Sequence, residues 1–132
     1  MSRKIANTKT IETNSLIEEL LEHLNSEQIV IPNSEEVRKY LRQYPDIIDL
    51  VGFASDETRD RFAPSIQLSL ELYRDPEFED EYLTLYVRQE KYADDIMDII
   101  DEIRDSIISF CDHELILKSG DFFVTTDFNF PR

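Results

Sequence analysis

Hydrophobic and polar residues alternate between Ser65 and Arg88, on both sides of an acidic segment. The hydrophobic positions are Ile66, Leu68, Leu70, Leu72, Leu83, Leu85 and Val87. The positions between them are Gln67, Ser69, Glu71, Tyr73, Tyr82, Thr84, Tyr86 and Arg88. A period of two places successive side chains on opposite faces of a strand. The pattern therefore predicts a β-hairpin that is buried on one face only.

Helical periodicity occupies the chain before this hairpin. The first apolar stripe is formed by Leu16, Ile17, Leu20, Leu21 and Leu24. Ser15 followed by Glu18 is a capping-box pattern, so we expect the first helix to begin at Asn14 or Ser15. Residues 1–13 carry three basic residues and are expected to be a flexible basic tail.

Shorter helical pieces follow the first stripe. Asn33 is expected to cap a second helix, and Pro45 is expected to end or kink that helix. Gly52 is expected to close a third piece, and Ser55 is expected to begin a fourth. The short apolar run at residues 29–31 fits either a connector or an edge strand.

A long amphipathic helix is predicted after the hairpin, from Tyr92 to about Cys111. Isoleucines recur along it at helical spacing, and acidic residues occupy the remaining positions. We expect the isoleucine stripe to pack on the flat apolar face of the hairpin. A turn at residues 119–121 then leads into a terminal strand, which alternates from Phe122 to Phe130.

The order of these elements indicates an α+β fold: N-terminal helices, a β-hairpin, a long amphipathic helix and a C-terminal strand. Together they are expected to form a small antiparallel or mixed sheet with helices on one face. Residues 14–132 are expected to be a single domain, since that length is sufficient to bury one core. Repeated βα units are lacking, which argues against a doubly wound fold. The two glycines leave no glycine-rich phosphate loop.

The formal net charge of −15 at pH 7 limits the classes of partner. Dense negative charge repels phosphates and anionic membranes, so direct nucleic-acid binding by the folded domain is not expected. No apolar run approaches the roughly 20 residues that a membrane span needs. The N-terminus lacks the apolar segment of a secretory signal, so a cytoplasmic location is expected. Simple solubility is the alternative reason for the charge.

Six residues of the predicted hairpin form the candidate interaction surface: Glu71, Tyr73, Tyr82, Thr84, Tyr86 and Arg88. Tyrosine and arginine are enriched among the residues that contribute most to protein–protein binding. Glu71 and Arg88 are expected to form a cross-strand ion pair. This pair is interpreted either as part of the binding surface or as a surface salt bridge of little energetic value. We expect the tyrosine rings to be covered either by the N-terminal helices or by another chain.

No residue is assigned a catalytic, metal-binding or cofactor-binding role. The acidic turn 75–81 offers oxygen ligands but lacks the glycine and the ligand spacing of a calcium loop, so a solvated turn is favoured, with an acidic tip that docks a partner as the further alternative. Cys111 is expected to be a small buried hydrophobic residue, and residues 112–114 to form no catalytic dyad with it. The two histidines give no metal-ligand spacing. His23 is expected only to interact with a helix dipole.

The segment LELYRDPEFEDEYLTLYVR and the later TTDF resemble segments of small bacterial and archaeal proteins of uncharacterised activity, cyanobacterial ones among them. The similarity covers roughly residues 34–130 in the order of elements. It implies no activity, and no catalytic residue is carried over from it.

These observations favour a non-enzymatic interaction or regulatory module, such as an antitoxin-like partner of a basic protein. The expected partner is a protein, either a second copy of the chain or a basic protein. Two alternatives remain open at this point. One is a small Mg²⁺-dependent hydrolase or nucleotide-handling enzyme that uses the acidic residues, and the other is a mimic of nucleic acid.

Overall fold

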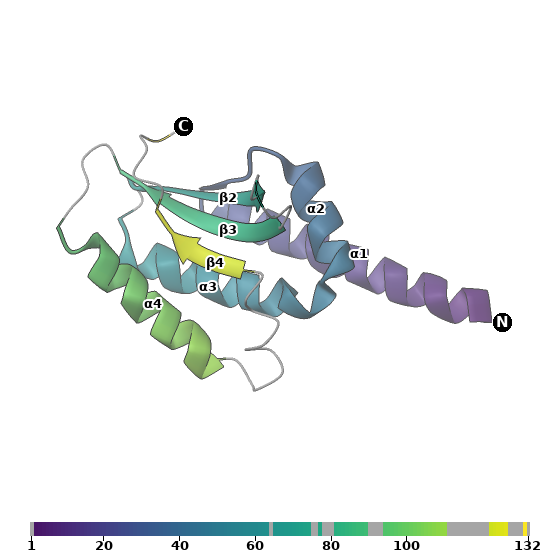
Figure 1. Cartoon of the computed structure of the whole chain (residues 1–132). Helices are drawn as coiled ribbons and strands as arrows, with labels where there is room; N and C mark the ends of the chain where they lie inside the picture. Colours follow the sequence, from purple (N-terminus) through teal and green to yellow (C-terminus); the bar gives the residue numbers. More distant parts are fainter. Residues whose placement is uncertain are drawn as a thin grey trace.

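The computed structural model describes residues 2–63, 65–74, 77, 81–89, 94–110, 122–126 and 131, with side chains from residue 11 onward. Its elements in chain order are α1 (Ser2–Ser26), β1 (Ile29–Val30), α2 (Ser34–Gln43), the 3₁₀ helix η1 (Pro45–Ile47), α3 (Ile48–Arg61), β2 (Gln67–Arg74), β3 (Glu81–Arg88), α4 (Ile96–Phe110) and β4 (Phe122–Thr125) (Figure 1). The predicted α+β class is confirmed.

The sheet has four strands in the order β1-β2-β3-β4. The β2–β3 hairpin is antiparallel, whereas β1 pairs parallel with β2 and β4 pairs parallel with β3. A parallel pair needs a crossover connection. The segment from α2 to α3 makes the crossover between β1 and β2, and α4 lies in the crossover between β3 and β4. Of the two predicted sheet types, antiparallel or mixed, the structure has the mixed one.

The apolar hairpin face lies at the centre of the core. Leu70 and Leu85 are paired across β2 and β3, and both are fully buried. From α4, Ile100 and Ile103 belong to the same buried cluster, as the isoleucine stripe predicts. Each such burial contributes roughly 1.5–3 kcal/mol relative to exposure. Helices α1, α3 and α4 lie on this side of the sheet (Figure 1), which leaves the opposite face as the candidate site.

Helix α1 begins at Ser2, so the predicted start at Asn14 or Ser15 is wrong. The segment at residues 2–13, which was expected to be a flexible tail, has a helical backbone. The chain contains no glycine or proline before Pro32. Nothing in the sequence therefore stops the helix from continuing toward the N-terminus, and a capping-box pattern inside a helix is not an N-cap. The N-terminal turns of α1 extend beyond the sheet (Figure 1).

Helix α3 continues through Gly52, so the predicted break there and the predicted new start at Ser55 are wrong. A glycine inside a helix costs roughly 0.5–1 kcal/mol relative to alanine. Val51 and Ala54 are fully buried on either side of it, and their burial offsets that cost. A Cβ at position 52 would lie 3.5 Å from Cδ1 of Leu20, so α1 and α3 pack closely here.

Two predictions about the connecting segments are confirmed. Asn33 caps α2: its Oδ1 accepts a hydrogen bond from the backbone N–H of Glu36 at 3.3 Å. The apolar run at residues 29–31 supplies β1, which is an edge strand.

Helix α4 falls inside the predicted span, and the terminal strand starts at Phe122 as predicted. Residues 90–93, the turn at 119–121 and the predicted strand residues 127–130 lie outside the described residues. Among the helices that the structure describes, none has the length and apolar character needed to cross a bilayer.

Candidate functional site

The six residues predicted to form the interaction surface lie on one face of the sheet. Glu71 pairs with Thr84, and Tyr73 pairs with Tyr82. The remaining two, Tyr86 and Arg88, pair with Ser69 and Gln67, which point the same way. We call this the polar sheet face. The β3–β4 register adds Phe123, which is the partner of Thr84.

One end of the polar sheet face is a buried ion pair. Nη1 of Arg88 donates to Oε2 of Glu71 at 2.5 Å, and the two side chains are only 2% and 17% exposed. The hydroxyl of Ser69 donates to the same carboxylate oxygen at 2.7 Å. The guanidinium also lies 4.5 Å from the ring centroid of Tyr86, in cation–π contact. The predicted cross-strand pair is correct, but its interpretation as a surface salt bridge is wrong because the pair is buried.

The other end of the polar sheet face is aromatic. The rings of Tyr73 and Tyr82 are stacked, with centroids 6.1 Å apart. Tyr82 meets Phe123 edge to face at 5.4 Å. Tyr73 is 43% exposed and Phe123 is 41% exposed. We call these three residues the aromatic group. Phe123 was absent from the predicted surface, although the alternation of the terminal strand already placed it on the otherwise polar side.

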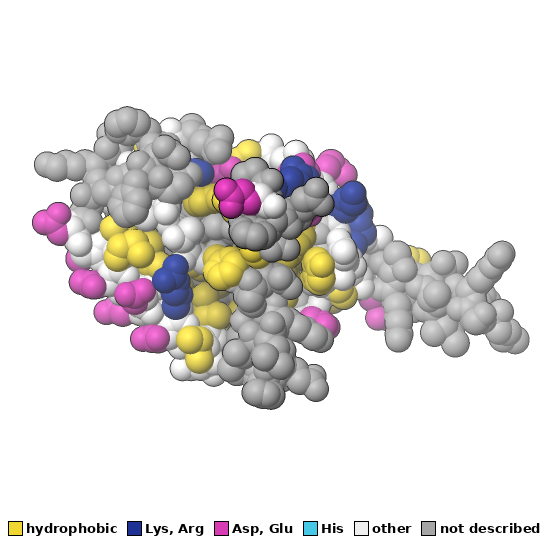
Figure 2. Space-filling model, in the orientation of Figure 1, with side chains coloured by type: hydrophobic (Ala, Val, Ile, Leu, Met, Phe, Trp, Pro, Cys, Tyr) yellow, Lys and Arg dark blue, Asp and Glu magenta, His cyan; other side chains and the backbone are white. Residues whose placement is uncertain are grey.

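Acidic side chains lie beside the aromatic group at Arg74 and, on the helical side of the sheet, along α4. Arg74 is shared by two carboxylates: its Nε lies 3.1 Å from Glu81, and its Nη2 lies 2.7 Å from Glu36. On α4 and the residues just before it, the exposed acids are Asp94, Asp95, Asp98, Asp101, Glu102 and Asp105. We call these the α4 acidic row, and acidic side chains gather over α4 in Figure 2. Arg104 of α4 donates to the carbonyl of Val124 at 3.4 Å, so α4 lies against β4 from the helical side of the sheet, opposite the face that carries Phe123.

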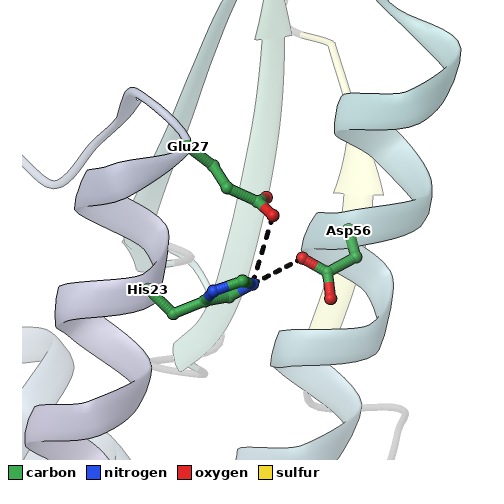
Figure 3. Close-up of side chains that lie close together, drawn as sticks. All are labelled: His23, Glu27 and Asp56. Atoms are coloured by element: carbon green, nitrogen blue, oxygen red, sulfur yellow. Dashed lines mark hydrogen bonds and ion pairs between the residues drawn. The ribbon is translucent and has the colours of Figure 1, made fainter.

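A second cluster lies on the helical side of the molecule. Nε2 of His23 is 2.6 Å from Oδ1 of Asp56 and 3.2 Å from Oε1 of Glu27 (Figure 3). His23 is in the last turn of α1, Glu27 follows four residues later, and Asp56 is on α3. Sequence reasoning missed this cluster because it compared only the two histidines. The spacing of four between His23 and Glu27 could have indicated half of it.

The protonation of this cluster is shifted from ordinary values. The hydrogen bond to Asp56 raises the pKa of His23 above its usual 6.5. Burial, and then the adjacent Asp56 carboxylate, raise the pKa of Glu27 above 4.5. Two carboxylates therefore lie close together around one imidazole, and Glu27 ionises less readily than an exposed glutamate.

Several predicted features lie wholly or partly outside the described residues. Of the acidic turn 75–81, the structure describes only Glu77 and Glu81. Cys111 and residues 112–114 fall outside it as well, so their expected roles stay predictions.

In comparisons with known proteins, no family model, no curated protein and no solved structure matches the chain.

Proposed function

We propose that this chain is a non-enzymatic interaction module that binds a basic protein partner through the aromatic group. The observation that carries this proposal is the run of three touching rings, Tyr73, Tyr82 and Phe123, on the sheet face opposite the helices. Tyrosine and phenylalanine are enriched at protein interfaces because they bury a large area with few rotatable bonds. Grouped aromatic exposure of this kind supports a docking surface.

The charge of the chain favours a basic partner over a second copy. Two copies would each bring a net charge of −15 to a shared interface, and like charges oppose such association. The shared Glu36–Arg74–Glu81 group lies next to the aromatic group, because Arg74 and Glu81 directly neighbour Tyr73 and Tyr82 along the strands. The α4 acidic row adds exposed negative charge on the helical side of the sheet. Lysine and arginine side chains at the rim of a partner would meet these acids. The aromatic group would then supply the apolar centre of the interface.

The proposal is tested by copurification with the double variant Tyr73→Ser, Phe123→Ser. The unmodified chain is expected to retain one basic protein at a fixed stoichiometry, and the double variant is expected to lose it. Ile108→Ser is the matched control, because this side chain is 57% exposed on α4, away from the aromatic group. Raising the salt concentration should weaken the complex, because rim charges are screened.

Three results would redirect or refute the proposal. Concentration-dependent dimerisation that is lost in the double variant would make a second copy the occupant of this surface. Competition between the captured partner and duplex DNA would favour a mimic of nucleic acid. If the double variant and Ile108→Ser capture the same protein equally well, the aromatic group is not the docking surface.

A further inference from the structure

We propose that His23, Glu27 and Asp56 bind a divalent transition-metal ion, with Zn²⁺ as the best match, at the junction of α1 and α3. One ligand atom from each residue lies within 4.8 Å of the other two. Figure 3 shows the three side chains pointing toward one another across the space between the two helices. The site is independent of the polar sheet face and of the interaction proposed for it.

The distances between the ligand atoms suit a metal ion. Zinc binds nitrogen and oxygen ligands at about 2.0–2.2 Å. Such bond lengths place neighbouring ligand atoms roughly 2.9–3.5 Å apart in octahedral or tetrahedral geometry. The separations of 2.6 Å from His23 to Asp56 and 3.2 Å from His23 to Glu27 lie near this range. The third pair, Glu27 and Asp56, lies within 4.8 Å, so side-chain rotation is needed to bring all three ligand atoms to bonding distance of one ion.

The set of donor atoms selects the class of metal. One imidazole nitrogen and two carboxylate oxygens suit zinc, manganese, iron, cobalt or nickel. Calcium and magnesium prefer oxygen ligands alone and a larger number of them. Two carboxylates and a neutral imidazole also balance the charge of a divalent ion. Three protein ligands leave at least one coordination position for water.

A buried carboxylate oxygen supports the presence of a cation. Within the part of the chain that the structure describes, Oε2 of Glu27 is buried and has no hydrogen-bond partner. Leaving a buried acceptor unsatisfied costs roughly 1–3 kcal/mol, and more when the group is charged. This oxygen belongs to the carboxylate whose Oε1 already faces His23. A metal ion bound through both oxygens of that carboxylate would satisfy it.

The charges next to the cluster are of both signs. Arg59 is a neighbouring base whose pKa is lowered by burial and raised by the charge of Glu27, but its Nη2 donates to the carbonyls of Ala63 and Ile66 at 2.8 and 2.9 Å. Its Nη1 donates to the carbonyl of Glu27 rather than to the carboxylate. Asp60 adds a further negative charge near Glu27. The guanidinium is therefore held by backbone carbonyls, and the carboxylates remain directed at His23.

The competing interpretation is a protonated histidine that only pairs with two carboxylates. A proton and a metal ion would compete for the same Nε2, because a ligating imidazole must be neutral. The two interpretations differ in their measurable consequences. An ion pair gives no selective metal affinity, whereas a metal site binds zinc more tightly as the pH rises through the pKa of His23.

Isothermal titration calorimetry of the EDTA-treated full chain tests the site. Zn²⁺, Mn²⁺, Mg²⁺ and Ca²⁺ are titrated separately at pH 6.0 and pH 7.5. All titrations use the double variant Cys111→Ser, His113→Gln as the background protein. It lacks the single cysteine of the chain and the only histidine besides His23, both of which could bind zinc. We expect one Zn²⁺ per chain, tighter at the higher pH, with Mg²⁺ and Ca²⁺ at least 10-fold weaker.

Two ligand variants and one matched control complete the test. His23→Ala and Asp56→Asn are each expected to weaken Zn²⁺ binding at least 10-fold, since the loss of even an outer-shell partner costs about 10–100-fold. Asp49→Asn is the control, because it removes the same charge from an exposed position two turns earlier on α3. Zinc should also raise the thermal midpoint of the background protein and of the control, but not of the ligand variants.

Two results would overturn the proposal. The first is equal affinity for Zn²⁺ and Ca²⁺, which would indicate attraction to surface acids alone. The second is an equal loss of Zn²⁺ affinity in Asp56→Asn and Asp49→Asn, which would show that general charge rather than the cluster binds the ion. Circular dichroism of each variant confirms that the fold is retained before the affinities are compared.

Discussion

Removing the negative charge of Glu71 is expected to destabilise the protein far more than removing that of Glu81. Both residues pair with an arginine across the same two strands, β2 and β3. Glu71 pairs with Arg88 at 2.5 Å, and the arginine is only 2% exposed. Glu81 pairs with Arg74 at 3.1 Å, and these side chains are 44% and 55% exposed. The hairpin thus contains a buried pair and an exposed pair that serve as controls for each other.

The expected magnitudes follow from burial. Removing one partner of a buried ion pair typically costs about 3–5 kcal/mol. The side chain of Glu71 is 17% exposed. We therefore expect the lower end of that range for Glu71→Gln, a loss of about 3 kcal/mol in the free energy of unfolding. Glu81→Gln should lower it by no more than about 1 kcal/mol, as for other exposed pairs.

Urea denaturation followed by circular dichroism measures both variants. With a slope of about 2 kcal/mol/M, the midpoint should fall by roughly 1.5 M for Glu71→Gln and by less than about 0.5 M for Glu81→Gln. The slopes themselves should stay unchanged. If the two midpoints fall equally, or if Glu71→Gln costs less than about 1 kcal/mol, the reasoning that Arg88 is a buried charge held by Glu71 is refuted.

Two further predictions concern the core and the histidine cluster. Ile103→Ala should lower the free energy of unfolding by about 2–5 kcal/mol, because it leaves a cavity in the core. Ile108→Ala, at an exposed position of the same helix, should change it by less than about 0.5 kcal/mol. Equal urea midpoints for the two variants would contradict the packing of α4. In the presence of EDTA, stability should fall as the pH rises above 6.5 through the raised pKa of His23, because only the protonated ring pairs with Asp56 in the folded state. The stabilisation that protonated His23 contributes is fully present below pH 6.5. The raised pKa of Glu27 also makes the folded state less stable as the pH rises from 4.5 upward. Thermal midpoints recorded at several pH values should show a shallower fall above pH 6.5 for His23→Gln, and an unchanged slope would contradict the role of the ring.

The hairpin and its two faces were predictable from the sequence because the alternation is dense and uninterrupted. Each strand has eight residues, and a one-residue shift in register would expose every leucine. The same pattern could not predict that Arg88 is buried. A period of two assigns a residue to a face, but the cover over that face depends on tertiary contacts far along the chain.

Helix boundaries were predicted less well because local signals competed with packing. The capping-box pattern at Ser15 and the glycine at position 52 each suggested a boundary, and the structure has none at either position. A cap or a glycine changes stability by about 1 kcal/mol. At Gly52 the burial of Val51 and Ala54 outweighs that amount. The N-terminal turns of α1 instead extend beyond the sheet, where no glycine or proline interrupts the helix.

The cluster of His23, Glu27 and Asp56 could not be predicted from the sequence for a different reason. His23 and Asp56 are 33 positions apart, and they meet only because α1 packs against α3. No spacing rule within one helix relates two such residues. Only the pair of His23 and Glu27 has a local signature.

The sheet topology has a consequence for the order of folding. Among the described strands, only β2 and β3 are joined by a short connection, whereas both parallel pairs require the chain to travel through helices first. Closing a longer loop costs more conformational entropy, and pairings between distant segments form more slowly. We therefore expect the hairpin to form first and the two edge strands to dock on it late. Since β1 and β4 depend on these late contacts, amide hydrogens there should exchange before those of β2 and β3.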